Sequence, residues 1–377
     1  MVKIFKNKFV IIMLLVVLFF FFGSITNTLV LNNRGIVVGM GLDCTEDGKV
    51  VLNCQILVAG ATGAEGEEND NYAILTAEGR TFGEATQRML VDSAEYMSFA
   101  HCNSIIVGKS MAESGKLFVI LDELLKNSKI TENTNLVYYD GKSLDMLKQK
   151  VGINLMASFA IQRMVSLSKG YVNVASCSIK DYMVGVKRTG GAVVMPEVVV
   201  SEKIEEAIGS EQGKGRVVLS LKGGACLSGD GVVLRLTEEE VGYYNIVAKD
   251  FKLGTFSMDT PDGVRSLEFR DKSSDFTHDV EGVLTTCKID ARVIESLYIN
   301  DVEGRDDDEK EIIAARFEQG VKEGIESIYS KCKEMGADIF EVYGGFSKKY
   351  GKKFEIEHPN FSEEFILKVE VEAEIAP

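Results

Sequence analysis

The residues best suited to chemistry in this chain are three histidines, seven cysteines and a run of acids, and their spacing does not form a catalytic site. His101 stands beside Cys102, the pairing that a thiolate nucleophile would use. Neighbouring residues point to opposite faces of a strand, so these two side chains need not meet. The sequence contains no G-x-S-x-G, H-E-x-x-H or Walker A motif. We therefore predict a non-enzymatic protein with no catalytic residue.

The cysteines do not have the spacing of a metal site. They stand singly, without a CxxC or CxxH pair, at Cys44, Cys54, Cys102, Cys177, Cys226, Cys287 and Cys332. Zinc and iron–sulfur sites need clustered ligands, and an odd number of cysteines argues against a full disulfide framework. We expect most of these side chains to be small buried apolar groups.

Two further patterns resemble binding motifs but fit a structural role better. The acids Asp301, Glu303 and Asp306 to Asp308 lack the spacing of an EF-hand loop, and they suit a solvated helix start that complements the helix dipole. Gly39-Met40-Gly41 lacks the third glycine of a dinucleotide fingerprint, and a strand follows where a helix should begin. We predict close backbone packing there, and no cofactor-binding or metal-binding residues.

The charge of the chain excludes some partners. With 57 acidic and 42 basic side chains among 377 residues, the formal charge is −15, which repels nucleic acid and anionic lipid surfaces. A hydrophobic content of 45% is typical of a folded protein, and the length suits two or three domains.

An apolar run near the N-terminus predicts a membrane segment. Lys3, Lys6 and Lys8 precede fourteen apolar residues at 9–22, and no charge follows until Arg34. Basic residues on the N-terminal side place that end in the cytoplasm and the body on the extracytoplasmic side. We favour an uncleaved single-pass anchor over 1–29; the alternatives are a cleaved signal peptide and a lipoprotein signal, which needs a cysteine just after the apolar run.

The remaining sequence alternates strand and helix signals. Two apolar runs at 35–43 and 49–58 flank an Asp-Gly turn, which predicts a hairpin, and the acidic, glycine-rich segment 59–71 predicts an exposed loop. Capping-box patterns predict helix starts at Thr81, Ser110 and Thr237. Residues 150–190 have a helical pattern, and several strand patterns lie between 255 and 297.

The C-terminal half contains the clearest helix. Its apolar side chains recur every three or four residues, at Ile313, Phe317, Val321, Ile325, Ile328 and Cys332. Gly336 is a natural stop, and 365–375 alternates as a strand does. The polar segment 201–216 is the best domain boundary. We predict an α+β protein of mixed sheets with packed helices, divided into the anchor 1–29, an N-terminal α+β region 30–200 and a C-terminal α+β domain 201–377.

Five motifs in order resemble the Ger(x)C family, the C subunits of GerA-type spore germinant receptors. They are GIVVGMGLDCTEDGK, LTAEGRTFGEATQRML, YMSFAHCNSIIVGKSMAESG, GACLSGDGVVLRLTEEEVGYYNIV and MGADIFEVYGGFSKKY, and the resemblance runs from Gly35 to Glu374. Family members usually begin with a lipobox and Cys-Trp-Asp, whose Cys would fall near Ile25. This chain has GSITNTLVLNN there and no tryptophan, which favours a peptide anchor where relatives use a lipid.

The resemblance implies a non-enzymatic subunit of a nutrient-germinant receptor in the spore inner membrane. Its implied partners are a multi-spanning A subunit and a permease-like B subunit, with His101 a structural residue of the family motif. A second hypothesis is a membrane-tethered solute-binding protein that captures the germinant itself, which predicts a concave site with converging polar and aromatic groups. An extracytoplasmic hydrolase is disfavoured by the missing motifs.

Overall fold

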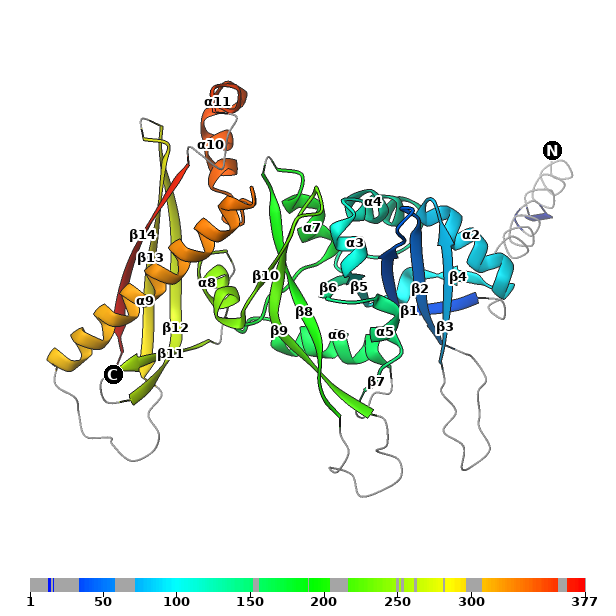
Figure 1. The fold of residues 1–377 in the computed structure, drawn as a ribbon, viewed down its shortest axis with the longest axis horizontal. Coiled ribbons are helices and arrows are strands. Elements are labelled where there is room, and N and C mark those ends of the chain that lie inside the picture. Colours follow the sequence, from blue (N-terminus) through cyan, green and yellow to red (C-terminus); the bar gives the residue numbers. More distant parts are fainter. Residues whose placement is uncertain are drawn as a thin grey trace, which may run out of the picture.

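A computed structural model places two β-sheets along an elongated molecule (Figure 1). The described residues are 13–14, 16, 34–57, 72–151, 156–188, 190–203, 216–248, 251, 254–260, 263–280, 282–295, 307–358 and 365–376. Nearly all of the anchor predicted at 1–29 lies outside them, as does the loop predicted at 59–71. Within these ranges, no helix combines the length and the apolar character that a bilayer crossing requires.

The first sheet is mixed and has the strand order β10-β9-β8-β6-β5-β1-β2-β3, with β4 beside β1 and β7 beside β9. Its strands are β1 (Arg34–Cys44), β2 (Val50–Leu57), β3 (Tyr72–Gly79), β4 (Tyr96–Ser98), β5 (Ser104–Gly108), β6 (Asn135–Tyr139), β7 (Lys150–Val151), β8 (Ala192–Lys203), β9 (Arg216–Ser228) and β10 (Val233–Leu236). Its helices are α2 (Phe82–Ser93), a 3-10 turn (Phe99–His101), α3 (Lys109–Glu113), α4 (Leu117–Asn127), α5 (Ser143–Leu147), α6 (Ala157–Ser168) and α7 (Ile179–Gly185).

Helices cover both faces of this sheet, which explains its continuous apolar strands. Ile105 and Val107 of β5 join the core with α2, α4 and α7, whereas Ile106 between them joins the core with α5 and α6. Alternate side chains of a strand point to opposite faces, so all three are fully buried.

Gly39 and Gly41 of β1 allow two helices to approach this sheet closely. A Cβ at Gly39 would meet the side chain of Ser158 on α6, and one at Gly41 would meet Ser143 on α5. The predicted close packing of Gly39-Met40-Gly41 is therefore confirmed. Nearby, the buried Asp43 carboxylate accepts hydrogen bonds from the Ser143 N–H and hydroxyl, which fixes α5 against β1.

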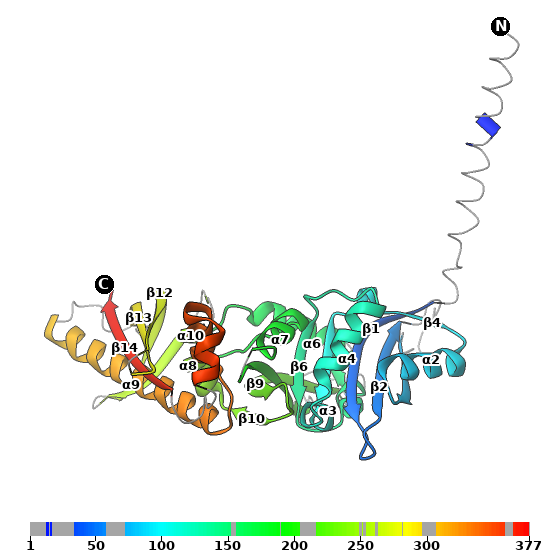
Figure 2. The ribbon, with the colours of Figure 1, turned by 90° about the horizontal axis from the view of Figure 1, so that it is seen from above.

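The second body is a four-stranded sheet, in the order β11-β12-β13-β14, with one long helix packed on it. Its strands are β11 (Thr255–Thr260), β12 (Gly263–Asp279), β13 (Leu284–Glu295) and β14 (Ile366–Ile375). Its helices are α9 (Asp307–Glu334), α10 (Val342–Tyr350) and α11 (Lys352–Glu357), and α8 (Glu238–Ala248) connects it to the first sheet. Seen from above, β14 and α9 lie at the opposite end of the molecule from β1 and α2 (Figure 2).

The predicted apolar stripe of α9 forms the centre of the second body. All six side chains from Ile313 to Cys332 are buried against the sheet. Phe317 is fully buried and contacts Phe256 and Phe269, with ring centroids 5.4 and 5.5 Å away. Gly336, with a φ of 71°, follows the helix end as predicted. The α+β prediction with mixed sheets is confirmed.

Two of the three predicted helix starts are correct. The hydroxyl of Thr81 accepts the N–H of Glu84 at 3.1 Å, and Thr237 and Glu240 form a reciprocal capping box. The prediction at Ser110 is wrong, because α3 begins after Gly108 and the Ser110 hydroxyl instead accepts the N–H of Cys44. The Ser110 hydroxyl, which the sequence pattern predicts to cap a helix, thus accepts a hydrogen bond from a distant part of the chain.

The segment around the predicted domain boundary joins two paired strands. β8 precedes it and β9 follows it, and the two strands run antiparallel within the first sheet. That sheet therefore contains strands from both sides of residue 200, while the division of the chain into domains at that residue stays a prediction.

We predict that the Phe317→Ala variant loses about 3–5 kcal/mol of unfolding free energy, because the deletion leaves a cavity between α9 and the sheet. Urea unfolding of the full chain, followed by circular dichroism, measures this loss. The control is Ile312→Ala on the same helix, which is 57% exposed and should change stability by less than about 0.5 kcal/mol. Equal losses in both variants would contradict this account of the core.

Candidate functional site

The structure separates the two side chains of the His101-Cys102 pair. His101 ends the 3-10 turn Phe99–His101 and is exposed, whereas Cys102 is 2% exposed. The pair therefore lies in a tight turn, which corrects the strand assumed from the sequence. Burial raises the pKa of the Cys102 thiol to about 12, so the thiol stays protonated at neutral pH. This pair has no activated nucleophile.

The other sequence candidates do not form a metal site in the described part of the chain. Six of the seven cysteines are buried, and all seven are free thiols. Residues 301–306 of the acidic run lie outside the described residues, and Asp307 opens α9. Among the residues that the structure describes, no three His, Cys, Asp or Glu side chains are grouped so as to hold a metal ion.

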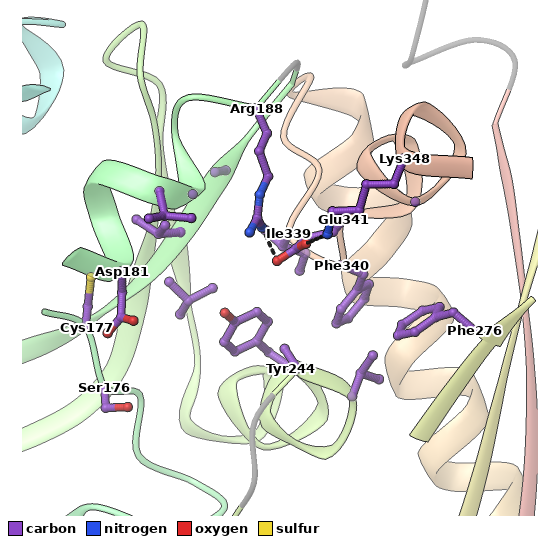
Figure 3. Close-up of a pocket in the computed structure, with 18 of the residues that line it drawn as sticks. Ser176, Cys177, Asp181, Arg188, Tyr244, Phe276, Ile339, Phe340, Glu341 and Lys348 are labelled. Carbon is purple, nitrogen blue, oxygen red and sulfur yellow. Dashed lines mark hydrogen bonds and ion pairs between the residues drawn. The ribbon is translucent and has the colours of Figure 1, made fainter. Parts of the chain in front are cut away.

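A cleft between the two bodies is the strongest candidate site. Its volume is about 690 Å³, within the range typical of ligand pockets. One wall comes from α7 and the start of β8, the opposite wall from 339–349, and the floor from α8, with the end of β12 at one side. Figure 3 shows side chains from both bodies facing this space.

The wall formed by α7 is fixed by a capping box that the sequence analysis did not identify. The Ser178 hydroxyl accepts the N–H of Asp181, and the Asp181 carboxylate accepts the backbone N–H of Ser178. The motif was present as Ser178-Ile179-Lys180-Asp181, with Asp in place of the usual Glu or Gln. Asp181 therefore has a structural hydrogen bond and lines the cleft as well.

The opposite wall depends on a buried carboxylate. Asp338 is 4% exposed and accepts the backbone N–H groups of Val342 and Tyr343, at 2.8 and 2.9 Å, at the start of α10. Its own N–H donates to the carbonyl of Gly190 in the first body at 2.7 Å. One residue thus orients α10 and joins it to the loop before β8.

Burial shifts the proton affinity of this carboxyl group. Loss of hydration raises the pKa of Asp338 to about 7, against the opposing effect of the backbone N–H donors, and the neighbouring Glu341 charge raises it further. The carboxyl group is therefore partly protonated at neutral pH, and its charge depends on pH in the physiological range.

Charged side chains complete the joint on the solvent side. The Arg188 guanidinium of the first body forms an ion pair with Glu341, and Lys348 of α10 reaches the same carboxylate at 3.5 Å (Figure 3). The cleft lining contains four basic side chains, Lys180, Arg188, Lys348 and Lys349, against two acidic ones, Asp181 and Glu341. Its formal charge of +2 contrasts with −15 for the whole chain.

The floor of the cleft is mainly aromatic and aliphatic. Tyr244 of α8 stacks with Phe340, their ring centroids 6.1 Å apart, and Phe276 and Val247 lie alongside. His278 packs on Phe346, and its ring Nδ1 lies 3.0 Å from the Thr285 hydroxyl. Burial, and then the charge of Lys349, lower the pKa of His278. Aromatic rings beside basic side chains are an arrangement that suits binding.

The sequence analysis missed this cleft because its lining comes from four separate stretches. These are 176–194, 244–248, 276–278 and 339–349. None carries a recognised binding motif, and only their folding places them together. The weak signals available were the Ser178 capping pattern and the acid of Gly336-Ala337-Asp338 before an aromatic helix.

Comparisons with known proteins define the class. Residues 27–200 match the family model of the spore germination protein N-terminal domain, and 222–376 match the model described as spore germination B3/GerAC like, C-terminal. The crystal structure of the GerBC protein has 13% sequence identity and a TM-score of 0.54, covering 90% of this chain and 97% of that one. This likeness shows the fold alone. The architecture is thus that of a spore germination protein with α+β bodies.

The chain belongs to the GerAC-like spore germination family, as the Ger(x)C resemblance predicted. Spore germination protein KC of Bacillus subtilis (strain 168) is 22% identical over 173 residues. That match covers 44% of this chain and 42% of the relative, so it spans less than half of either protein.

The buried carboxyl group predicts a pH-dependent stability. Asp338 has a native pKa of about 7 and an ordinary value of 3.8, so between these values the native state holds more protons than the unfolded state. The contribution of Asp338 to the free energy of unfolding is therefore complete below about pH 4 and is lost as the pH rises through 7. The Asp338→Asn variant has no such titrating group, so this loss should be absent. Between pH 4 and 8 the unfolding free energy of wild type should therefore fall by up to about 4 kcal/mol relative to that of the variant.

Urea unfolding at intervals across this pH range measures the difference. The exposed Asp92→Asn on α2 is the control and should follow wild type at every pH. Parallel curves for wild type and Asp338→Asn would contradict the assigned role of Asp338.

Proposed function

We propose that this protein is the non-enzymatic C subunit of a membrane receptor for nutrient germinants, acting in spore germination through protein–protein contacts. The observation that carries the proposal is the pair of family models, which match 27–200 and 222–376 in the order that the family has.

The proposed location is the spore inner membrane, with the body on the extracytoplasmic side. The support is the apolar run at 9–22 with three lysines before it, together with the membership of a germination family. The missing cysteine near Ile25 favours a single-pass peptide anchor over a diacylglycerol group.

The proposed partners are a multi-spanning A subunit and a permease-like B subunit. The body is elongated (Figure 1), which suits contacts with more than one subunit along its length. Its charge of −15 disfavours nucleic acid and anionic lipid as partners, which leaves proteins.

Direct capture of the germinant is the second candidate function. The observation in its favour is the cleft between the bodies, where basic side chains and aromatic rings converge. A concave site of this composition is what a solute-binding protein requires.

Deletion of the gene should abolish the germination response to one set of nutrients while spores still form in normal numbers, because a receptor subunit acts only after sporulation. Loss of absorbance of purified spores after the addition of each nutrient measures the response. Spore yield, and germination by a receptor-independent trigger such as high pressure, are the controls. An unchanged response to every nutrient, with paralogous genes also removed, would contradict the proposal.

A further inference from the structure

The cleft between the two bodies is lined by the hydroxyl of Tyr244. Tyr244 is 7% exposed, yet its hydroxyl has no hydrogen-bond partner among the described residues. Figure 3 shows the ring of Tyr244 pointing its hydroxyl into the open space, toward the side where Asp181 and Arg188 lie. Among the described residues, the one buried side-chain N or O atom without a partner is Asn245 Oδ1, so the Tyr244 hydroxyl reaches the open cleft and is available to a molecule there.

The protonation state of the Tyr244 hydroxyl decides whether it can donate a hydrogen bond. Burial raises the pKa of Tyr244 above its usual value, and the nearby Cys177 acts in the same direction. The hydroxyl therefore keeps its proton and can donate a hydrogen bond to a ligand oxygen.

The charge around the cleft selects for anions. Lys180 on α7 is exposed and has no ion-pair partner in the described chain, and Arg188 retains further N–H groups beyond those used on Glu341. The two acids of the lining are already engaged, Asp181 by Ser178 and Glu341 by Arg188. An incoming carboxylate therefore meets the Lys180 ammonium and the N–H groups of Arg188 that Glu341 does not use, while the net charge of the lining stays at +2.

The floor selects for an apolar portion. Val247 of α8, Phe276 of β12 and Phe340 from the 339–349 wall form this apolar side of the cleft. These side chains present ring and methyl surface, and no charged group among the described lining residues comes from α8. A ligand with one carboxylate and a short apolar tail uses both parts of the site.

We propose that this cleft binds a small amphipathic carboxylate, with the Tyr244 hydroxyl and Lys180 on its carboxylate and the aromatic floor against its tail. The residues come from both bodies, so bound ligand connects α7 to α8 and the α10 wall. Binding would then favour one relative position of the two sheets. The inference rests on the geometry of the cleft and does not require membership of a receptor complex.

The test uses the full chain in detergent micelles and two matched probes, 3-(4-fluorophenyl)propionate and its neutral amide. Fluorine NMR measures the saturable line broadening of each probe, with protein-free micelles as the blank. The carboxylate should bind, and the amide should bind at least about tenfold more weakly, because a charge-assisted hydrogen bond is lost. Tyr244→Phe should weaken binding of the carboxylate probe by about threefold to tenfold.

Variants distinguish the site from general attraction. Lys180→Gln should weaken binding of the carboxylate probe by about threefold and leave binding of the amide probe unchanged. The controls are Tyr96→Phe and Lys169→Gln, which change exposed residues outside the cleft lining and should leave both probes unaffected. Tyr244→Phe keeps the ring stack on Phe340, so circular dichroism should show an unchanged fold.

Three results would overturn the proposal. They are the absence of saturable binding, equal binding of carboxylate and amide, and unchanged carboxylate binding in Tyr244→Phe. Equal weakening by Lys169→Gln and Lys180→Gln would also overturn it, because the effect would then report the overall charge of the protein.

Discussion

One buried residue, Asp338, connects the two bodies through its backbone and orients α10 through its carboxylate. Asp338 orients the first turn of α10 and, through its own N–H, holds the carbonyl of Gly190 in the first body. The adjacent Glu341 forms the ion pair with Arg188. These contacts act together with the shared apolar core, in which Ile339 and Phe340 pack with Val194 of the first sheet. The cost of burying Asp338 is visible in its raised pKa, and the three backbone donors around it offset part of that cost.

Each sheet contributes differently to function. The first is covered by helices on both faces, so its residues are mostly committed to packing, as at Ile105, Ile106 and Val107. The second packs α9 against one face. Charged, polar and aromatic side chains line the cleft where the two bodies meet. Binding sites are commonly found at such junctions.

Local signals in the sequence predicted the local structure well. The stripe of α9, the hairpin at Gly48 and the capping box at Thr237 each depend on residues close in the chain, and each is present. Ser110 failed because its hydroxyl bonds to Cys44 across the fold. The cleft could not be predicted for the same reason. Tyr244, Arg188 and Glu341 form a common lining only after folding brings distant segments together. The family resemblance predicted the class of protein but no residue of this site.

We propose that this chain works as a subunit held in a membrane receptor. Affinity purification of the tagged full chain from crosslinked spore inner membranes, with mass spectrometry of the products, tests it most directly. The account predicts that a multi-spanning subunit and a permease-like subunit are recovered with the chain, and that crosslinks connect its α+β bodies to them. Recovery of the chain alone, with crosslinks only within itself, would contradict the account.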